Sequence, residues 1–527
     1  MTTGSNDRPA LCAGLKVLDL SWGVAGPIAG MVLSDFGAEV IKIEPPGGDP
    51  FRSMPGAVQW HRGKKSVVLD LKDAKQREQA QQLAASADVL IESFRPGVAD
   101  RLGVGYGALS RINPRLVYCS ITGFGTKGPW RNLKAYEGVV SARGGYFAGQ
   151  KVGWRAPGPV YLVAKQVSYG ATNYALQGIF GALRRRLTTG HGDRVETNLL
   201  QGGVAFQINT TYKWKDASKT PARTAPPDAA DPLSTVACYR ICRCSDGKWI
   251  QLGAFQSDIF HRMMVALGMD EESKDLRYVD APQFKSDEDS LRIIKRLEEQ
   301  IAKKPYAHWA AAFEKMDCPY SPHLSTQEAL DDVQVRAIGL VVNVDDPVQG
   351  KTEQVGAPFV IADSGWRVHG PAPLVGQHNG QGFATSSKTS HVARNGRANG
   401  FMLDGVKVLD VTTYVAAPTA TGYLVDYGAD VIKVEPPGGD PQNNWGDVGT
   451  RPNRGKRSIW LDLKHEKGRE VLYKMVEKTD IFLQNFRPGV DQRLGIDFDT
   501  LIKINPRLVY CHAASYGSTG PYSKRGA

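Results

Sequence analysis

Cysteines are the first residues in this chain whose spacing suggests chemistry. Cys238, Cys242 and Cys244 lie within ACYRICRCSDG. Thiolates bind zinc, usually in a set of four ligands. Here a fourth ligand is missing and no histidine is nearby. The spacing of four and two places the three side chains on one face of a strand. We therefore expect them to pack as small apolar residues, and we expect no metal site.

Glu44 could bind the ribose of a dinucleotide, because it ends a strand-like run about 20 residues after the first loop. A nicotinamide site also needs a G-x-G-x-x-G turn, in which glycines let the backbone approach the pyrophosphate. The loop at 21–30 reads SWGVAGPIAG and lacks that pattern. The matching loop at 412–422, TTYVAAPTATG, has fewer glycines still. The sequence therefore argues against NAD binding.

The net charge of +11 would attract a polyanion. Lys and Arg are dispersed, and the densest run, Arg184–Arg186 in LRRRLTTGHG, has the pattern of a helix C-terminus followed by a glycine cap. This distribution favours a phosphorylated small molecule over nucleic acid. The chain has no apolar run of membrane-spanning length and starts without a secretory pattern, so we expect no membrane partner. Seven cysteines, an odd and small number, fit a cytoplasmic location.

The elements around these residues alternate between apolar, β-branched runs and helix-like stretches. This alternation predicts an α/β fold with a parallel, Rossmann-like sheet in a large domain. The predicted strands are 16–20, 39–44, 66–71, 88–93 and 115–125, and the clearest helices are 26–37 and 73–87. Residues 231–330 change character and predict a smaller inserted α/β domain, with a hairpin turning at Ser245–Gly247 and amphipathic helices at 290–304 and 307–316. Residues 335–361 predict returning strands.

Much of the chain is written twice. INPRLVYC occurs at 112–119 and at 504–511, and RGKKSVVLDLK (62–72) is matched by RGKRSIWLDLK (454–464). DFGAEVIKIEPPGGDP (35–50) is matched by DYGADVIKVEPPGGDP (426–441). A period this long is that of a duplicated domain, far beyond a solenoid repeat. We call residues 13–380 copy one and residues 404–527 copy two.

The expected division of the chain follows from these patterns. It comprises a large domain at 13–230, the small domain at 231–330, a return segment at 331–380, a Gly/Ser/Asn-rich linker at 381–403 and an incomplete second large domain at 404–527.

These motifs, together with ADVLIESFRPGV, TTGHGDRVETNLLQG and PLVGQHN, resemble the class III CoA-transferases, the CaiB/BaiF family that includes formyl-CoA transferase and α-methylacyl-CoA racemase. The resemblance covers nearly all of copy one and everything present of copy two. It implies transfer of coenzyme A from an acyl-CoA to a carboxylic acid through covalent aspartyl intermediates, with CoA as substrate and without a metal. It also implies dimers interlocked like chain links, so an interlocked homodimer or an intramolecular pseudo-dimer of the two copies is expected.

The resemblance also implies which residues meet CoA, at loops that follow the strands. Cations there would bind the phosphates and an aromatic ring would lie near the adenine. In copy one these positions are Leu69, Lys72, Ser93, Phe94, Arg101 and Lys134. In copy two they are Leu461, Lys464, Asn485, Phe486 and Arg493.

The nucleophile is where copy one departs from the family. The resemblance places the family's aspartate at Ser168, and no Asp or Glu occurs from Gly138 through Arg186. Glu137 matches an auxiliary glutamate of some transferases. The racemase branch requires a His–Asp pair, and Tyr136–Glu137 stands there instead. Copy one is therefore expected to lack the covalent mechanism.

The matching aspartate of copy two is expected about 392 positions after Ser168, beyond Ala527. Two hypotheses remain open. The chain is either a fragment of a tandem CoA-transferase, or a CoA-binding or acyl-CoA-binding module without turnover.

Overall fold

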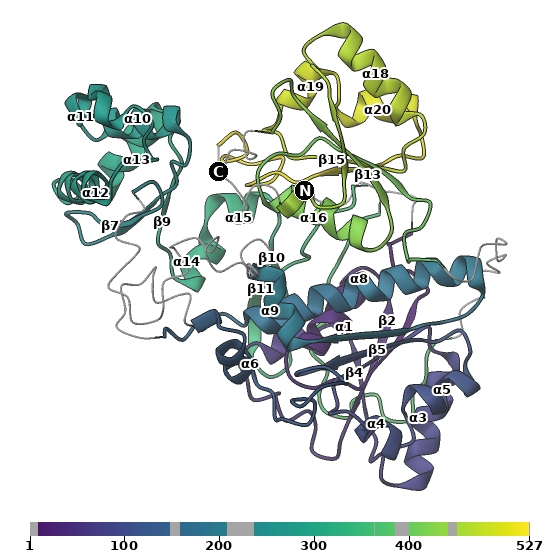
Figure 1. The fold of residues 1–527 in the computed structure, drawn as a ribbon. Coiled ribbons are helices and arrows are strands. Elements are labelled where there is room, and N and C mark those ends of the chain that lie inside the picture. The colour runs from purple at the N-terminus through teal and green to yellow at the C-terminus, as the bar shows by residue number, and fades with distance from the viewer. Residues whose placement is uncertain are drawn as a thin grey trace.

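The computed structural model describes residues 9–147, 159–207, 237–362, 364–384, 400–440 and 451–525. Each copy contains a parallel sheet, and among the described residues two small antiparallel sheets lie between them in sequence. In Figure 1 the sheet of copy one lies in the lower body, the sheet of copy two in the upper body, and the small domain to their left. The predicted α/β class with a parallel sheet is confirmed.

The first sheet has the order β3-β2-β1-β4-β5-β6, and all its pairings are parallel. Its strands are β1 (Lys16–Asp19), β2 (Glu39–Glu44), β3 (Lys65–Val68), β4 (Val89–Glu92), β5 (Val117–Thr122) and β6 (Arg194–Asn198). The central strands are buried on both faces, as continuous apolar runs predict. Because all strands point the same way, the loops after β1 and β4 meet at one edge.

The second sheet repeats the first, with the order β14-β13-β12-β15-β16. Its strands are β12 (Lys407–Asp410), β13 (Asp430–Glu435), β14 (Arg457–Trp460), β15 (Ile481–Gln484) and β16 (Val509–His512). The registers also match, since Leu18 pairs with Ile41 in copy one and Leu409 with Ile432 in copy two. The repeated sequence therefore folds to a repeated topology.

Helices of copy one cover both faces of its sheet. They are α1 (Ala25–Asp35), α2 (Ala57–Trp60), α3 (Ala74–Ser86), α4 (Val98–Arg101), α5 (Tyr106–Ile112), α6 (Glu137–Arg143), α8 (Gln166–Thr189) and α9 (Leu199–Gln207). Helix α8 ends at Gly190, whose φ of 74° suits a residue without a Cβ. The predicted helix C-terminus at Arg184–Arg186 is thus confirmed. Arg186 is largely buried and pairs with Asp88 at 3.0 Å.

The small domain begins with the predicted hairpin and packs helices on it. Its strands are β7 (Ile241–Arg243), β8 (Trp249–Leu252) and β9 (Tyr320–Pro322), and its helices are α10 (Ser257–Ala266), α11 (Asp270–Lys274), η2 (Leu276–Tyr278), α12 (Asp287–Ile301) and α13 (Tyr306–Lys315). Cys238, Cys242 and Cys244 are buried in its core with Phe260 and Ile250. The packing interpretation of these cysteines is confirmed.

The return to copy one differs in detail from the prediction. Helices α14 (Thr326–Asp331) and α15 (Val333–Ala337) come first, and β10 (Val341–Asp346) and β11 (Gly350–Val355) form a hairpin of their own, separate from the main sheet. The chain then runs along β3, where the backbone N–H of His378 donates to the carbonyl of Ser66 at 2.9 Å. Of the predicted linker, residues 385–399 lie outside the described residues.

Copy two carries α16 (Ala416–Asp426), η4 (Arg451–Asn453), α18 (Glu466–Val476), α19 (Val490–Leu494) and α20 (Phe498–Ile504). Its contacts with copy one include the following hydrogen bonds. The hydroxyl of Tyr174 on α8 donates to that of Tyr423 on α16 at 3.1 Å. Gln334 on α15 is buried and bonds the backbone of 516–522.

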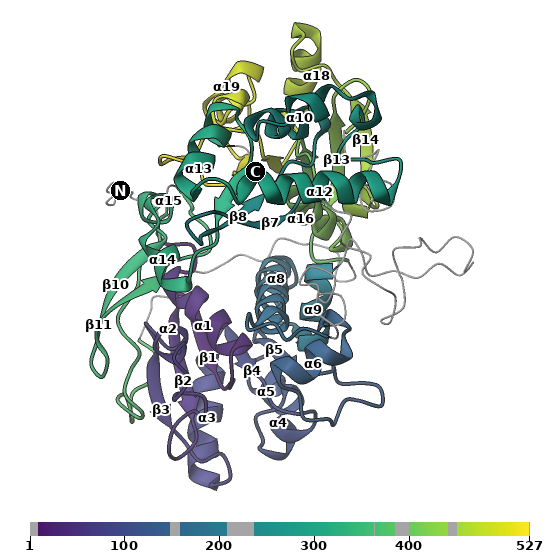
Figure 2. The same ribbon diagram turned by 90° about the vertical axis from the view of Figure 1, so that its left-hand side faces the viewer.

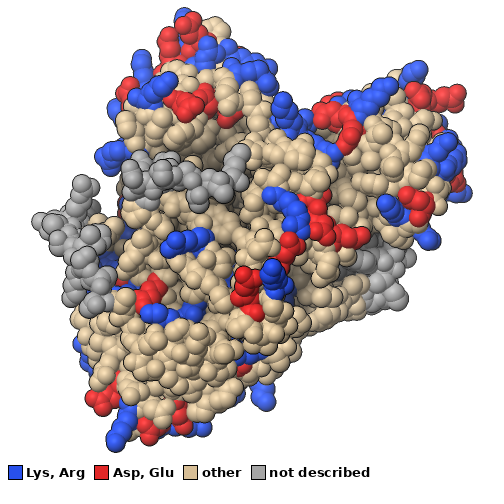
Figure 3. All heavy atoms as spheres, turned by 180° about the vertical axis from the view of Figure 1, so that it is seen from behind, with Lys and Arg blue, Asp and Glu red and all other residues tan. Residues whose placement is uncertain are grey.

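The distribution of surface charge and the apolarity of the helices relate to the expectation that neither nucleic acid nor a membrane is a partner. Figure 3 shows positive and negative side chains interspersed over one face, without a continuous basic stripe among the described residues there. Among the helices in the described ranges, none has the length and apolarity to cross a membrane.

Candidate functional site

The N-terminus of α8 brings Ser168 and Glu137 together. Glu137 is the first residue of α6, and its carboxylate reaches the first turn of α8. Oε1 accepts the backbone N–H of Val167 at 2.8 Å, and Oε2 accepts the backbone N–H and the hydroxyl of Ser168 at 3.2 and 2.6 Å. The first turn of a helix has N–H groups without partners, and a carboxylate satisfies them. Glu137 thus caps α8.

The surroundings of this pair hold it in place. Ser168 is 5% exposed. The hydroxyl of Thr172, one turn further along α8, donates to the carbonyl of Ala25 at 2.9 Å and fixes α8 against α1. Gly170 faces Gly202 of α9 so closely that a Cβ at Gly170 would lie 1.9 Å from the carbonyl oxygen of Gly202. The pKa of Tyr169 is raised mainly by burial and further by the nearby negative charge of Glu137.

The loops after β1 and β4 form a second feature. The hydroxyl of Ser93 accepts the backbone N–H of Trp22 at 2.7 Å and donates to its carbonyl at 3.1 Å. Phe94 meets the ring of Trp22 edge-on at 5.8 Å and packs on the core cluster that contains Leu69. The structure therefore brings Ser93, Phe94 and Leu69 together, around a tryptophan that the sequence reasoning missed.

The same loop pair recurs in copy two. The side chain of Asn485 accepts from the backbone N–H of Thr413 at 2.8 Å and donates to its carbonyl at 2.9 Å. Phe486 and Leu461 pack against the core of copy two. Asn485 thus performs with an amide what Ser93 performs with a hydroxyl.

The predicted cations lie at the surface around these loops. Lys72 lies in the loop after β3, and Arg101 is the last residue of α4. Lys134 lies in the loop before α6. Lys464 and Arg493 occupy the matching places in copy two. All five are exposed, as groups that bind a soluble polyanion must be. No described side chain forms an ion pair with any of them.

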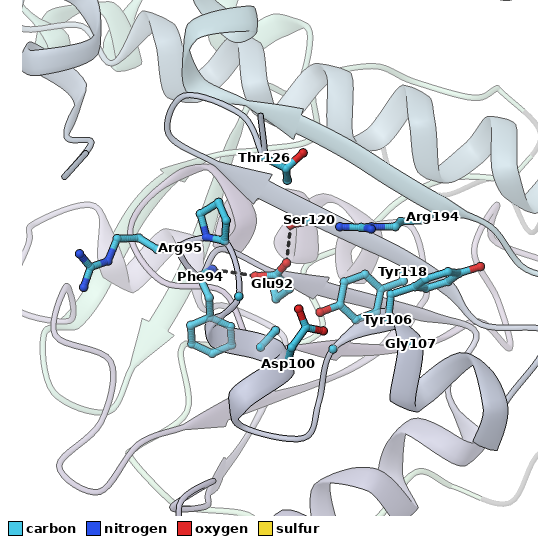
Figure 4. A pocket seen from close by; sticks show the side chains of 14 residues that line it. Glu92, Phe94, Arg95, Asp100, Tyr106, Gly107, Tyr118, Ser120, Thr126 and Arg194 are labelled. Atoms are coloured by element: carbon cyan, nitrogen blue, oxygen red, sulfur yellow. Dashed lines mark hydrogen bonds between the residues drawn. The ribbon is translucent and has the colours of Figure 1, made fainter. Parts of the chain in front are cut away.

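A small polar hollow lies beside Phe94, and Figure 4 looks into it. Glu92 at the end of β4 is buried there, accepting from the Ser120 hydroxyl and from the backbone N–H of Phe94. Burial raises the pKa of Glu92. Arg194 lines the opposite side, while Arg95 points away from Glu92. Of the predicted CoA-contacting residues, only Phe94 lines this hollow.

A buried charge cluster beneath the β1 loop was also missed by sequence reasoning. Lys64 donates to Asp19 at 2.7 Å, and Lys42 pairs with Asp49 at 3.1 Å. Burial alone would raise the pKa of Asp19, but Lys42 and Lys64 hold it below its ordinary value. Burial lowers the pKa of Lys64 to about 8.

Copy two repeats this cluster, with Lys456 donating to Asp410 at 2.7 Å and Lys433 pairing with Asp440 at 3.3 Å. Burial likewise lowers the pKa of Lys456 to about 8. The duplication of Lys42, Asp49 and Lys64 in DFGAEVIKIEPPGGDP and RGKKSVVLDLK was the signal that could have identified them.

The small domain contacts the loop after β15 in copy two. Arg487, next to Phe486, pairs with Asp317 of the small domain at 3.2 Å. Tyr414, in the loop after β12, has a φ of 67°, where Gly23 of copy one has 83°. Its pKa is raised by burial and by the nearby charges of Asp440 and Asp258. The predicted CoA loop of copy two therefore borders the small domain.

The model of CoA-transferase family III matches residues 12–379 and 403–527. The chain belongs to CoA-transferase family III. Both copies are matched, and together the two ranges contain every predicted site residue.

Individual members of the family show the same relationship. The chain is 28% identical to the CoA-transferase/lyase DddD of Marinomonas over 97% of this chain and 66% of that protein. It is 28% identical to the probable CoA-transferase Rv1866 of Mycobacterium tuberculosis over 97% of this chain and 65% of that protein. The chain therefore spans just under two thirds of these two relatives.

Shorter relatives and solved structures match about one copy. The acetyl-CoA:oxalate CoA-transferase of Acetobacter aceti is 32% identical over 62% of this chain and 85% of its own length. The crystal structure of Rv3272 from M. tuberculosis superposes with a TM-score of 0.61 at 26% identity, covering 71% of this chain and 99% of that one. A CaiB/BaiF protein of Brucella suis gives 0.59 at 27% identity, covering 70% of this chain and 98% of that one.

Among the described residues, no group of three metal-binding side chains exists. Copy one presents a polar start of α8, where the Ser168 hydroxyl and the backbone N–H groups bind the Glu137 carboxylate.

Proposed function

We propose that this chain is part of a longer enzyme that transfers coenzyme A from an acyl-CoA to a carboxylic acid, in which copy one binds CoA without forming a covalent intermediate. The observation that carries the proposal is the pairing of Ser168 with Glu137, because it leaves the family's nucleophile position without a free carboxylate. The covalent step is assigned to an aspartate of copy two, carried beyond residue 527 in the longer protein.

The chemistry explains why Ser168 is insufficient. In the family reaction a carboxylate oxygen attacks the thioester carbonyl and expels the CoA thiolate, which leaves a mixed anhydride. The thiolate then attacks the enzyme's own carbonyl, releases the acyl group as a carboxylate and forms an enzyme thioester. The acceptor carboxylate then attacks the enzyme thioester and expels the CoA thiolate, which leaves a second anhydride. The thiolate attacks the acceptor's carbonyl in this anhydride, which releases the new acyl-CoA and restores the enzyme carboxylate. A serine hydroxyl has no carbonyl that could carry CoA, so the second step is impossible at Ser168.

Glu137 does have a carbonyl carbon, but its oxygens are already engaged by three donors. Attack on a thioester would require it to give up hydrogen bonds to a charged group, which are stronger than neutral ones. It would also leave the first turn of α8 uncapped. Glu137 therefore acts as a positioning group for α8 in this proposal.

CoA binding is assigned to the exposed cations around the strand-end loops. Lys72, Arg101 and Lys134 would meet the phosphates in copy one, and Lys464 and Arg493 in copy two. The aromatic pair of Phe94 and Trp22 offers a surface for the adenine. The Tyr174–Tyr423 and Arg487–Asp317 contacts between the copies support an intramolecular pseudo-dimer over an interlocked homodimer.

A non-catalytic CoA-binding module is the second candidate, and the capped state of Glu137 favours it. The discriminating experiment incubates the longer protein with an acyl-CoA and then with hydroxylamine, and locates the modified residue by peptide mass spectrometry. An adduct on a carboxylate of copy two, absent when that aspartate is replaced by alanine, supports the transferase. An adduct on Glu137 would contradict the role given to copy one, and absence of any adduct or turnover would support the module.

A further inference from the structure

In copy one, the segment 374–379 covers the outer edge of β3. The backbone N–H of Ser66 donates to Nδ1 of His378 at 3.1 Å, and that of Val68 donates to Oδ1 of Asn379 at 2.8 Å. The N–H of Gly376 donates to the Ser66 hydroxyl at 2.9 Å. His378 also donates its N–H to the Ser66 carbonyl at 2.9 Å. Side chains of the Gln-His-Asn segment therefore accept the outward N–H groups of β3 that a neighbouring strand would otherwise bind.

Copy two has the same edge, and none of the described residues covers it as 374–379 covers β3. Ser458 and Trp460 of β14 correspond to Ser66 and Val68, and the register agrees, since Ile459 pairs with Val434 as Val67 pairs with Ile43. The Ser458 hydroxyl donates to Glu435, as that of Ser66 donates to Glu44.

The outward groups of this edge lack partners in the described ranges. No described atom hydrogen-bonds the backbone N–H of Ser458 or Trp460. Ser66 is fully buried, whereas Ser458 is exposed and Trp460 is 61% exposed. Figure 2 shows β14 at the outer side of the upper body.

Such an edge favours one kind of occupant. Unpaired strand edges recruit extended segments, and a large exposed aromatic ring beside them adds apolar contact area. In copy one the partners of Ser66, the donor Gly376 and the acceptor His378, lie 310 and 312 residues further along the chain. An equal separation from Ser458 passes residue 527, and the chain spans only 66% of DddD.

We propose that the edge of β14 is a docking site for a second segment of the Leu-Val-Gly-Gln-His-Asn type, carried by the longer protein on the C-terminal side of copy two. Its His and Asn side chains accept the N–H groups of Ser458 and Trp460. Its backbone meets the Ser458 carbonyl, and Trp460 packs on its apolar residues.

The experiment adds a synthetic peptide with the sequence of residues 370–384 to the chain and measures binding by calorimetry and hydrogen exchange. We expect saturable one-to-one binding and protection of residues 457–460. The control peptide carries His378→Ala and Asn379→Ala, and we expect it to bind at least about tenfold more weakly, because it lacks the two side-chain acceptors for the N–H groups of the strand edge.

A matched variant tests the surface. Ser458→Pro deletes the outward N–H, and proline is tolerated on an edge strand when that N–H faces solvent. We expect this variant to lose peptide binding while β14 remains folded. If β14 unfolds in the variant, the comparison of the two peptides on the unaltered chain still tests the proposal.

Each of three results would overturn the proposal: protection at 65–68 in place of 457–460, equal binding of the control peptide, or no saturation up to about 1 mM peptide. The last limit is the order of the effective concentration of a segment tethered within the same chain. Concentration-dependent dimerisation of the chain, abolished by His378→Ala, would assign the edge to a second molecule and overturn the stated source. None of these measurements involves CoA, so their failure leaves the proposed function untouched.

Discussion

The hydroxyl of Ser168 and Oε2 of Glu137 are 2.6 Å apart, although 31 residues separate them in sequence. The hydrogen bond joins Ser168, where the family resemblance leads us to expect the nucleophile, to the first residue of α6. Because Glu137 also accepts the backbone N–H groups of Val167 and Ser168, one carboxylate organises the start of a 24-residue helix. Copy one thus uses its nearest carboxylate for structure.

Removing this cap should destabilise α8. Glu137→Ala leaves two backbone N–H groups and one hydroxyl without their acceptor, so we expect unfolding to require about 1–2 kcal/mol less. Urea titration followed by circular dichroism measures the loss. Glu78→Ala, an exposed position within α3, is the control and should change the free energy of unfolding by less than about 0.5 kcal/mol. Equal effects of the two substitutions would refute the capping role.

Ser168→Asp should not restore catalysis in copy one, because it places a second carboxylate against Glu137. Like charges at this distance raise the pKa of the introduced carboxyl group. A raised pKa means that the folded protein binds the extra proton more tightly, so this variant should gain stability as the pH falls from 8 to 5. Denaturation at several pH values measures this slope. Ser168→Asn lacks the charge and should show the slope of the wild type; if it matches Ser168→Asp instead, the electrostatic explanation fails.

Binding of CoA should depend on salt and on the exposed cations. We expect Lys72→Ala, Arg101→Ala and Lys134→Ala together to weaken binding of free CoA to copy one by about tenfold or more at low salt, since each removes a charge from a proposed phosphate contact. Calorimetry measures the affinity. A matched triple variant at Lys285, Lys303 and Lys351, exposed positions remote in sequence from these loops, should bind CoA normally. Unchanged affinity in the first variant would assign CoA to another surface.

The sheets were predictable because their signals are local. Apolar runs such as EVIKIE predict buried strands, and the repeated octamer required that the second sheet resemble the first. Asp73, which accepts the N–H groups of Lys75 and Gln76, lies at the predicted start of α3. Contacts within a few residues are therefore legible in the sequence.

The site was less predictable because its partners are distant. Ser93 meets Trp22 across 71 residues, and Lys64 reaches Asp19 across 45. Lysine and aspartate are ordinarily surface residues, so their types concealed a buried pair. The contact of Arg487 with Asp317 depends on how the small domain lies against copy two, which no local pattern encodes.

The buried lysines should leave a signature at alkaline pH. Burial lowers the pKa of Lys64 from 10.5 to about 8, so between these pH values the unfolded chain binds more protons than the folded one. Stability contributed by this group therefore rises with pH in that window, by at most about 1.4 kcal/mol per pH unit.

Buried thiols and phenols, such as Cys119 and Tyr118, act in the opposite sense because burial raises their pKa values. The lysine contribution is isolated by comparing the wild type with Asp19→Asn/Lys64→Met, which removes the pair together. The difference in free energy of unfolding should grow from pH 8 to pH 10 in favour of the wild type. A difference that is flat or falls over this range would show that Lys64 stays charged in the folded protein.

Copy two should depend on copy one for its fold. In isolation, residues 404–527 lose the partners of Tyr423, Tyr427 and the segment held by Gln334, and they retain two open sheet edges. Trp460 and Val509, on the edge strands β14 and β16, are about 60% exposed even in the whole chain. We expect the isolated segment to give broad, poorly dispersed NMR signals, whereas residues 1–380 remain soluble and dimeric.

The contact at Gln334 offers a milder version of the same test. Gln334→Ala removes hydrogen bonds to the carbonyls of Tyr516 and Thr519 and to the N–H of Tyr522, each worth about 1 kcal/mol when buried. Hydrogen exchange at 513–525 should accelerate in this variant and remain unchanged in Gln300→Ala, on the partly exposed face of α12. These bonds join copy two to helix α15 of copy one. Faster exchange confined to 513–525 would therefore show that copy two depends on copy one for its fold through this contact. Sharp, dispersed signals from isolated 404–527 would instead show that copy two folds alone and that the contact only orients it.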